Sequence, residues 1–265
     1  MIPYIGGKSY LASWIISNFP KNYQSMSYCE VFGGGGWLLF KKEPSFLEIY
    51  NELNSDLVNL FRVIRDNYEQ FEHRAQWSLH SREMYKEAIE RLQENEFESD
   101  IERAAHYAIL RTQTFSGGNS KSWGYQVTAR KATSGKWLPF LKRMEQINAR
   151  LKKVQIECLD FEKVIKKYDD KNTLFYLDPP YVDAEHYYKT DEVDFKKEDH
   201  ERLNETLRQI EGKFVVSYYD HPLVKKLYKG HRIIKKDSVK HSCGVTRGRK
   251  DILKPRSVEL LIMNY

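Results

Sequence analysis

The chain has 265 residues and a formal net charge of +6, and hydrophobic residues make up 41% of its composition. This apolar content excludes a largely disordered chain, and the length suits one large domain or one domain with a substantial insertion. No apolar run approaches the roughly 18 residues of a membrane span, and the N-terminus shows no signal-peptide pattern, so secretion is not expected. The three cysteines, Cys29, Cys158 and Cys243, are widely spaced, which favours reduced thiols in a cytoplasm over disulfides or a zinc site.

The first quarter of the chain alternates between strand and helix patterns. An apolar run over residues 27–32 ends in four glycines at 33–36. Such an alternation is typical of a parallel sheet covered by helices. The predicted elements are, in order, a helix at 9–16, a strand at 27–32, a helix at 37–40, a strand at 46–50 and a helix at 53–64.

A mostly helical insertion is predicted to interrupt this sheet. Residues 68–113 have helical spacing, with Ser81 and either Ser99 or Asp100 as N-caps. A segment rich in Gly, Ser, Thr and Lys follows and predicts a loop or hairpin at 114–137, and a further helix is expected at 139–152. Strand patterns then return, at 154–158, 173–177, 213–218, 232–235 and 258–263, with a helix at 198–209.

Two basic segments lie on an otherwise acidic chain. Residues 104–143 carry +7 with no Asp or Glu, residues 221–256 carry +10, and the remainder carries −11. Both segments could be solvated faces. The first, however, interleaves its cations with Phe115, Trp123, Tyr125, Trp137 and Phe140. Cations for phosphates mixed with aromatic groups for bases indicate a polyanion-binding surface.

The strongest chemical motif is Asp178-Pro179-Pro180-Tyr181, directly after a buried strand. The prolines cannot donate to a sheet ladder, so the strand must end there. Asp178 and Tyr181 are therefore expected at the carboxyl ends of the parallel strands, where ligands bind in open α/β folds. An ordinary Pro-Pro turn is the alternative explanation.

The glycines at 33–36 form a second candidate motif. A glycine loop between a strand and a helix lets the backbone approach a cofactor closely, and the acid Glu52 is placed to bind ribose hydroxyls. Taken singly, the loop could be a flexible turn and Glu52 a helix-capping acid. Gly7-Lys8-Ser9 lacks the preceding strand and glycine of a P-loop. A zinc deaminase is excluded because its Pro-Cys-x-x-Cys motif is missing.

Together these motifs resemble the Dam-type DNA adenine-N6 methyltransferases. Asp178-Pro179-Pro180-Tyr181 resembles the catalytic tetrad of amino-group methyltransferases that use S-adenosylmethionine. Residues 3–8, Pro-Tyr-Ile-Gly-Gly-Lys, look like the family's N-terminal cofactor motif. Residues 30–36, Glu-Val-Phe-Gly-Gly-Gly-Gly, are similar to its glycine-rich loop, although Val31 stands where the family usually has Pro.

The resemblance covers nearly the whole chain and is weakest over residues 68–150. Residues 51–57 resemble a segment in which the family usually has Asp, where this chain has Glu52. The motif order is also the family's. The resemblance implies an α/β fold with a Rossmann-like, mostly parallel methyltransferase sheet. The catalytic domain would comprise 1–67 and 151–265, and a mainly helical DNA target-recognition domain would be inserted at 68–150.

The resemblance also implies a set of site residues. Asp178 and the Pro179 carbonyl would accept hydrogen bonds from an adenine amino group flipped out of duplex DNA, and Tyr181 would stack on that base. The expected catalytic residues are Asp178, Pro179, Pro180 and Tyr181. The expected cofactor-binding residues, for S-adenosylmethionine, are Tyr4, Lys8, Glu30, Phe32, Gly34, Gly36, Glu52, Asp160, Phe161 and Asp178.

Some of these assignments have structural alternatives. Asp160 could equally cap a helix and Phe161 could belong to the core. Tyr187, Tyr188 and residues 219–222 are further candidates for the pocket wall. The expected DNA-binding residues, from the first basic segment, are Arg111, Lys121, Trp123, Tyr125, Arg130, Lys131 and Lys136.

The expected enzyme is cytoplasmic, encoded by a bacterium or a phage, and acts on double-stranded DNA as a monomer or weak dimer without a membrane or metal. Three other functions stay open. They are an RNA or protein amino-group methyltransferase, a DNA-binding relative with a vestigial site, and a nicotinamide-dependent enzyme. The last leaves Asp178-Pro179-Pro180-Tyr181 unexplained, and the glycine loop does not follow the usual dinucleotide-binding spacing.

Overall fold

The computed structural model describes residues 2, 4, 7–114, 122–124, 135, 137–182, 195–239 and 256–265. Within these residues, seven strands form one sheet in the order β3-β2-β1-β4-β5-β7-β6. Neighbours pair in parallel except around β7, which runs antiparallel to both β5 and β6. The strands are β1 (Ser27–Glu30), β2 (Leu47–Asn51), β3 (Val154–Glu157), β4 (Thr173–Leu177), β5 (Lys213–Tyr219), β6 (Arg232–Val239) and β7 (Arg256–Met263). The predicted α/β class with a mostly parallel sheet is confirmed.

The strand order reverses between β1 and β4. Ser27 of β1 pairs with Leu47 of β2 on one side and with Thr173 of β4 on the other. The chain continues from β1 to β2 in one direction and reaches β4 only after β3. A reversal of this kind leaves a crevice at the carboxyl ends of the two central strands, where open α/β sheets bind their ligands. The glycine loop follows β1 and Asp178 follows β4, so both motifs lie at this crevice.

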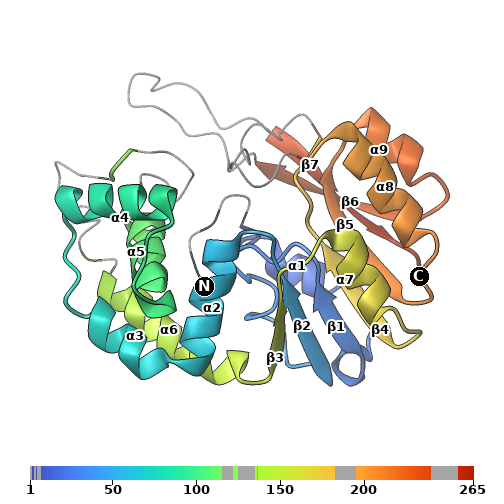
Figure 1. Ribbon diagram of the computed structural model, residues 1–265. Helices are drawn as coiled ribbons and strands as arrows, with labels where there is room; N and C mark the ends of the chain where they lie inside the picture. The colour runs from blue at the N-terminus through green and yellow to red at the C-terminus, as the bar shows by residue number, and fades with distance from the viewer. Residues whose placement is uncertain are drawn as a thin grey trace.

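Helices cover both faces of the sheet (Figure 1). Alternate strand residues point to opposite faces: Tyr28 and Tyr176 pack in one core cluster, and Cys29 and Phe175 pack in the other. The first cluster includes residues of α1 (Ala12–Ile16) and α2 (Ser55–Asp66). The second includes residues of α7 (Phe161–Tyr168), α8 (Lys197–Leu207) and α9 (Pro222–Leu227).

The segment between α2 and β3 forms a helical unit that packs on α2 (Figure 1). Arg103 Nε lies 2.7 Å from Oδ1 of Asp56, and Asn148 Nδ2 donates to the Ile64 carbonyl. Because these contacts join the unit to α2, it is fixed against the sheet rather than tethered by a linker. Its helices are α3 (Tyr68–Ala75), α4 (Arg82–Glu94), α5 (Asp100–Gln113) and α6 (Trp137–Leu151).

Several local predictions are confirmed. The side chains of Ser81 and Ser99 accept hydrogen bonds from the backbone N–H groups of Met84 and Glu102, so Ser99 rather than Asp100 is the second N-cap. An antiparallel bridge joins Thr114 to Trp123 inside the segment expected to form a loop or hairpin.

The helix expected at 37–40 is wrong. The chain makes successive turns there, with the Phe40 N–H bonded to the Gly36 carbonyl and the Lys42 N–H bonded to the Leu38 carbonyl. Pro44 follows closely. Because the residue before a proline rarely adopts helical dihedrals, the turns cannot continue as a helix past position 42. The strands predicted at 232–235 and 258–263 are longer in the structure, because β6 and β7 pair over eight positions. No helix among the described residues is long and apolar enough to cross a membrane.

Candidate active site

The glycine loop closes tightly over the end of β1. Gly34 and Gly36 have φ angles of +47° and +67°, which side-chain-bearing residues rarely adopt. A Cβ on Gly36 would lie 2.4 Å from Cε2 of Phe40. The loop therefore requires glycine for its conformation as well as for the approach of a ligand.

Glu52 lies against this loop. Its Oε2 accepts a hydrogen bond of 2.7 Å from the Gly34 N–H, and its Oε1 accepts one from Asn54. The Tyr50 hydroxyl donates to the Gly34 carbonyl at 2.6 Å. Glu52 therefore fixes the loop through both of its carboxylate oxygens.

Asn51, which directly precedes Glu52, joins three strand ends. Its Nδ2 donates to the carbonyls of Val31 and Leu159, both at 2.9 Å, and its Oδ1 accepts from the Leu159 N–H. The side chain is buried, so it satisfies backbone groups where β1, β2 and β3 end. Its position next to Glu52 was the one signal that could have drawn attention to it.

Glu30 is buried beneath the loop. Its Oε2 accepts hydrogen bonds from the Tyr28 hydroxyl and the Leu39 N–H, each at 2.9 Å. Burial raises the pKa of this carboxyl to about 8. Its contacts hold the turn after the glycine loop against β1.

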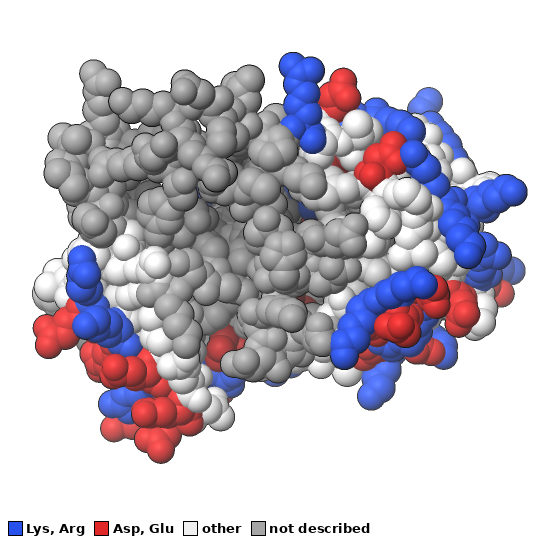
Figure 2. Space-filling view, turned by 90° about the horizontal axis from the view of Figure 1, so that it is seen from above, with Lys and Arg blue, Asp and Glu red and all other residues white. Residues whose placement is uncertain are grey.

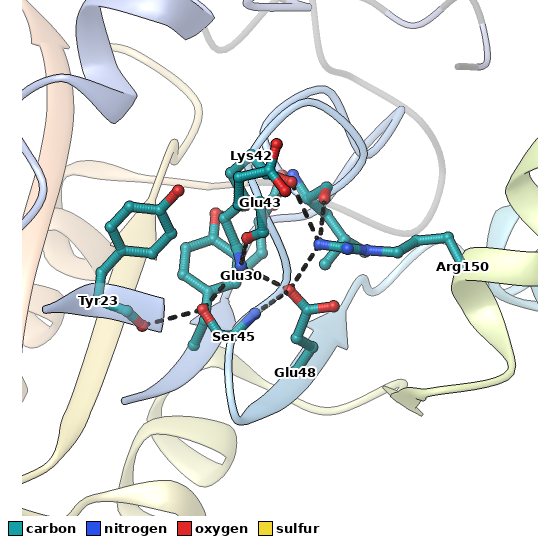
Figure 3. A network of polar contacts seen from close by, with 9 residues as sticks. Tyr23, Glu30, Lys42, Glu43, Ser45, Glu48 and Arg150 are labelled. Atoms are coloured by element: carbon teal, nitrogen blue, oxygen red, sulfur yellow. Dashed lines mark hydrogen bonds and ion pairs between the residues drawn. The ribbon is translucent and has the colours of Figure 1, made fainter. Parts of the chain in front are cut away.

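A buried charge network lies beside Glu30 and connects it with the helical unit (Figure 3). Arg150 of α6 donates to Oε1 of Glu48 at 2.8 Å and to the Leu39 carbonyl at 3.2 Å. Lys42 donates to the same Glu48 oxygen, and burial lowers the pKa of its ammonium. The network ties α6 to the turn that contacts Glu30.

Lys8 and Asp178 form the polar centre of the crevice. The Lys8 ammonium lies 2.7 Å from Oδ2 of Asp178 and 4.7 Å from the ring centre of Tyr181. The other carboxylate oxygen, Oδ1, is buried and accepts no hydrogen bond from the described part of the chain. Burial raises the pKa of Asp178, and the charge of Lys8 opposes that rise.

Tyr181 is held on several sides. Its hydroxyl donates a hydrogen bond to Oε1 of Glu259 on β7. Its ring lies 4.4 Å from the ring of Tyr219, edge to face, and 5.7 Å from that of Tyr218. Pro179 and Pro180, between the two motif ends, are buried. The motif thus has a rigid backbone and a fixed aromatic group.

A second cluster follows β3. The Asp160 side chain accepts from the Glu162 N–H at the start of α7, as the capping alternative proposed, and Phe161 is buried. Phe161 lies 5.8 Å from Phe32, ring centre to ring centre. The cluster therefore brings together three of the predicted cofactor residues.

The sequence did not indicate that Arg202 of α8 would join this cluster. Its guanidinium makes two contacts of 2.9 Å with Asp160 and lies 4.0 Å over the Phe161 ring. Burial acts to raise the pKa of Asp160, but the hydrogen bonds from Arg202 and from the Glu162 N–H, together with the charge of Arg202, lower the pKa overall.

Arg111 lies inside the protein rather than on a DNA-facing surface. It is buried in α5, and its guanidinium lies 4.8 Å over the ring of Tyr4. A Cβ on Gly34 would lie 2.9 Å from Cδ1 of Tyr4, so the Tyr4 ring packs on the glycine loop. The structure thus brings Arg111 to the predicted cofactor site.

Trp123 packs on the outer part of the helical unit. Its ring stacks on His80 at 4.9 Å, Arg82 lies over it at 4.9 Å, and its Nε1 donates to Oε1 of Gln113. The remaining predicted DNA-binding and pocket residues lie outside the described part of the chain: Lys121, Tyr125, Arg130, Lys131, Lys136, Tyr187 and Tyr188. Within that part, no group of three or more His, Cys, Asp or Glu side chains is arranged to hold a metal ion.

Comparisons with known proteins agree in the class of enzyme. A family model described as D12 class N6 adenine-specific DNA methyltransferase matches residues 4–241. The chain is 29% identical over 279 residues to the Type II methyltransferase M1.LlaDCHI of Lactococcus lactis subsp. cremoris, across 99% of this chain and 94% of that protein. It is 26% identical over 289 residues to the Type II methyltransferase M.MjaIII of Methanocaldococcus jannaschii, across 100% of this chain and 98% of that protein.

Proposed function

The chain belongs to the D12 class N6 adenine-specific DNA methyltransferases, and from this premise we propose that the crevice between β1 and β4 is its active site, with S-adenosylmethionine as the methyl donor. The enzyme methylates adenine in DNA. The observation that carries the assignment to this crevice is the buried Oδ1 of Asp178, which accepts no hydrogen bond from the residues that the structure describes. Asp178 directly follows β4, which pairs with β1, the strand before the glycine loop.

The residues around the glycine loop suit this cofactor. Glu52 would accept hydrogen bonds from the ribose hydroxyls, and the backbone of Gly34 and Gly36 would allow close approach. When bound, the cofactor supplies an electrophilic sulfonium methyl group. Lys8 and Tyr4 would border the cofactor, whereas Glu30 would act from beneath by supporting the loop.

The Asp160 cluster is proposed to hold the cofactor's adenine. Asp160 would accept from the ring amino group, and Phe32 and Phe161 would pack on the ring. Arg202 already pairs with Asp160 and covers Phe161. The Arg202 side chain would therefore either keep its contacts with Asp160 and Phe161 beside the ligand or adopt another rotamer when the ligand binds.

Asp178 would activate the amino group of the target adenine. Lys8 holds Oδ2, which leaves Oδ1 to accept one N–H of the amine, while the Pro179 carbonyl accepts the other. These hydrogen bonds draw the nitrogen toward tetrahedral geometry and restore its nucleophilicity. As the N–C bond forms, the bond between the methyl group and the cofactor sulfur breaks and leaves a neutral thioether. The nitrogen proton becomes acidic at this point, and Oδ1 would take it. Orientation of the two reactants supplies much of the rate.

The substrate base must leave the duplex to reach Asp178, because N6 is inaccessible in stacked DNA. We propose that Tyr181 stacks on the flipped base, a contact worth about 1–3 kcal/mol. Residues 68–150 would form the target-recognition domain on a catalytic domain of 1–67 and 151–265.

The charge on the surface constrains where DNA binds. Exposed cations lie on α9 and β6, and Lys and Arg side chains are frequent on that side in Figure 2. The outer side of the helical unit instead carries the exposed acids Glu83, Glu87, Glu90, Glu94, Glu96 and Glu98. DNA is therefore expected over the basic segments at 104–143 and 221–256 and away from that acidic side.

Since the relatives are Type II methyltransferases, we further propose that the chain methylates one short sequence and acts in restriction–modification. Purified protein incubated with duplex DNA and S-adenosylmethionine tests the proposal. The methyl group should be transferred to N6 of adenine in duplex DNA, and none should be transferred to RNA or peptide. Transfer to RNA or peptide in preference to DNA would exclude it.

A further inference from the structure

A buried acid on β7 lies next to the active site and was not singled out in the sequence. Glu259 is 1% exposed and is paired in the sheet with Tyr219. The four residues after it, 260–263, are all apolar and buried. An acid at such a position carries a desolvation cost that an apolar residue would avoid. A specific interaction of the Glu259 carboxylate is therefore expected to offset this cost.

That partner is Tyr181. Its hydroxyl donates to Oε1 of Glu259 across 78 residues of sequence. The ring of the same side chain lies beside the rings of Tyr218 and Tyr219, and the ammonium of Lys8 lies over it. The ring thus has van der Waals contacts along its body, and Glu259 gives it a directional anchor at its far end.

Resting on the proposed function, we propose that Glu259 is a positioning residue for methyl transfer, which fixes the Tyr181 ring in the orientation needed to stack on the target adenine. Glu259 acts through the Tyr181 hydroxyl and contacts no substrate itself. The hydrogen bond removes the freedom of the ring to rotate and slide within the crevice. Because the same ring lies beside Lys8, which holds Asp178, its displacement would also disturb the acceptor of the amine proton.

The chain offers variants that separate this role from a general contribution to stability. Glu259→Gln keeps an oxygen acceptor for the Tyr181 hydroxyl and removes the charge. Glu259→Met removes the acceptor at similar size, and Tyr181→Phe removes the donor while keeping the ring. The double variant replaces both partners with apolar groups, which leaves no buried polar atom of the pair unsatisfied. Ile262→Val, a conservative change at another buried position of β7, is the control for a general loss of stability.

The experiment measures kcat and KM for S-adenosylmethionine on a duplex substrate, with folding checked by circular dichroism. Fluorescence of 2-aminopurine at the target position reports stacking of the flipped base. We expect Glu259→Met to lower kcat by about tenfold or more with KM within about twofold, and to change the 2-aminopurine signal. Glu259→Gln should retain kcat within about threefold. In the Tyr181→Phe background, Glu259→Met should add less than about a twofold loss, because the donor is already gone.

Two results would overturn the proposal. One is a Glu259→Gln variant as impaired as Glu259→Met, since the charge rather than the acceptor would then matter. The other is a double variant in which the two losses multiply, since Glu259 would then act independently of the Tyr181 hydroxyl. Should Glu259→Met fail to fold, the kcat values of Glu259→Gln and of the double variant, each compared with its parent, test the proposal in its place. A wild-type protein that transfers no methyl group to DNA would instead count against the proposed function.

Discussion

The Lys8 ammonium lies 2.7 Å from Oδ2 of Asp178, so a residue near the start of the chain neutralises the carboxylate at the end of β4. The pair is largely buried, and removal of one partner from a buried ion pair leaves a costly unpaired charge. Lys8 also borders the Tyr181 ring. One cation therefore contacts both functional side chains of the motif at 178–181.

The first prediction concerns this pair. Lys8→Met removes the charge that opposes the rise in the pKa of Asp178, so the pKa should rise further and the carboxylate should hold its proton more strongly. Cofactor affinity should fall by about tenfold or more, roughly 1.4 kcal/mol, with a smaller effect on DNA affinity. Calorimetric titration with S-adenosylmethionine measures the change. Lys171→Met, an exposed lysine just before the amino end of β4, is the control. Equal cofactor affinity in the Lys8 and Lys171 variants would remove Lys8 from the cofactor site.

A second prediction concerns the glycine loop. Glu52→Ala leaves the Gly34 and Asn54 N–H groups without their acceptor and removes the proposed ribose contact. We expect a loss of about 1–3 kcal/mol in cofactor binding, and a smaller loss for Glu52→Gln, which keeps one acceptor oxygen. The same titration distinguishes them. Wild-type affinity for the alanine variant would show that the ribose is bound elsewhere.

The third prediction uses pH. Burial raises the pKa of Glu30 to about 8, above its value in the unfolded chain, so the native state holds the proton more tightly. The contribution of this group to stability is therefore fully present below pH ~4.5 and is lost as pH rises through about 8, at up to roughly 1.4 kcal/mol per pH unit.

Glu30→Gln tests that linkage. Its amide oxygen can accept from both Tyr28 and Leu39, as Oε2 does now. The free energy of unfolding of wild type should therefore fall relative to the variant between pH 6 and pH 8. A constant difference between the two proteins across that range, in denaturant titrations, would contradict a raised pKa at Glu30.

How far these features follow from sequence differs from one residue to another. Strand β4 was predicted at its observed bounds, 173–177, because a buried apolar run ending in Pro-Pro is a local signal. The N-caps at Ser81 and Ser99 are local in the same sense. The motifs after β1 and β4 could also be placed together, because the carboxyl ends of parallel strands share one edge of the sheet.

Contacts between residues that are distant in the sequence have no such local signal. Glu259 bonds Tyr181, 78 residues away, and Arg202 bonds Asp160, 42 residues away. Both partners lie in ordinary strand or helix patterns, and only the topology brings them together. Arg111 shows the opposite case. A cation in a basic, aromatic segment indicated DNA contact, yet α5 directs it inward onto Tyr4.

The fourth prediction concerns DNA recognition by the first basic segment. Lys121→Ala, Arg130→Ala and Lys136→Ala each remove a cation in that segment. Loss of a phosphate contact should weaken binding to all sequences and reduce the salt slope by about one unit. Loss of a base contact should cost about 1–3 kcal/mol on the cognate site and relax specificity.

Binding to cognate and scrambled duplexes across a salt series separates these outcomes. Lys171→Ala, an exposed cation at the opposite edge of the sheet, is the matched control. If all three variants bind as the control does, DNA recognition lies instead in the second basic segment, at 221–256.

The account depends most on Asp178 as the acceptor at the reacting amine. Modification-sensitive sequencing of DNA from cells that express the wild-type chain or Asp178→Ala reports the modified base and its sequence context together. We predict N6-methyladenine at one short sequence with the wild type. With the variant, we predict at least about a tenfold loss of methylation, the effect of roughly 1.4 kcal/mol in the barrier, at unchanged protein level and DNA affinity. Methylation by Asp178→Ala above about a tenth of the wild-type level would contradict the assignment.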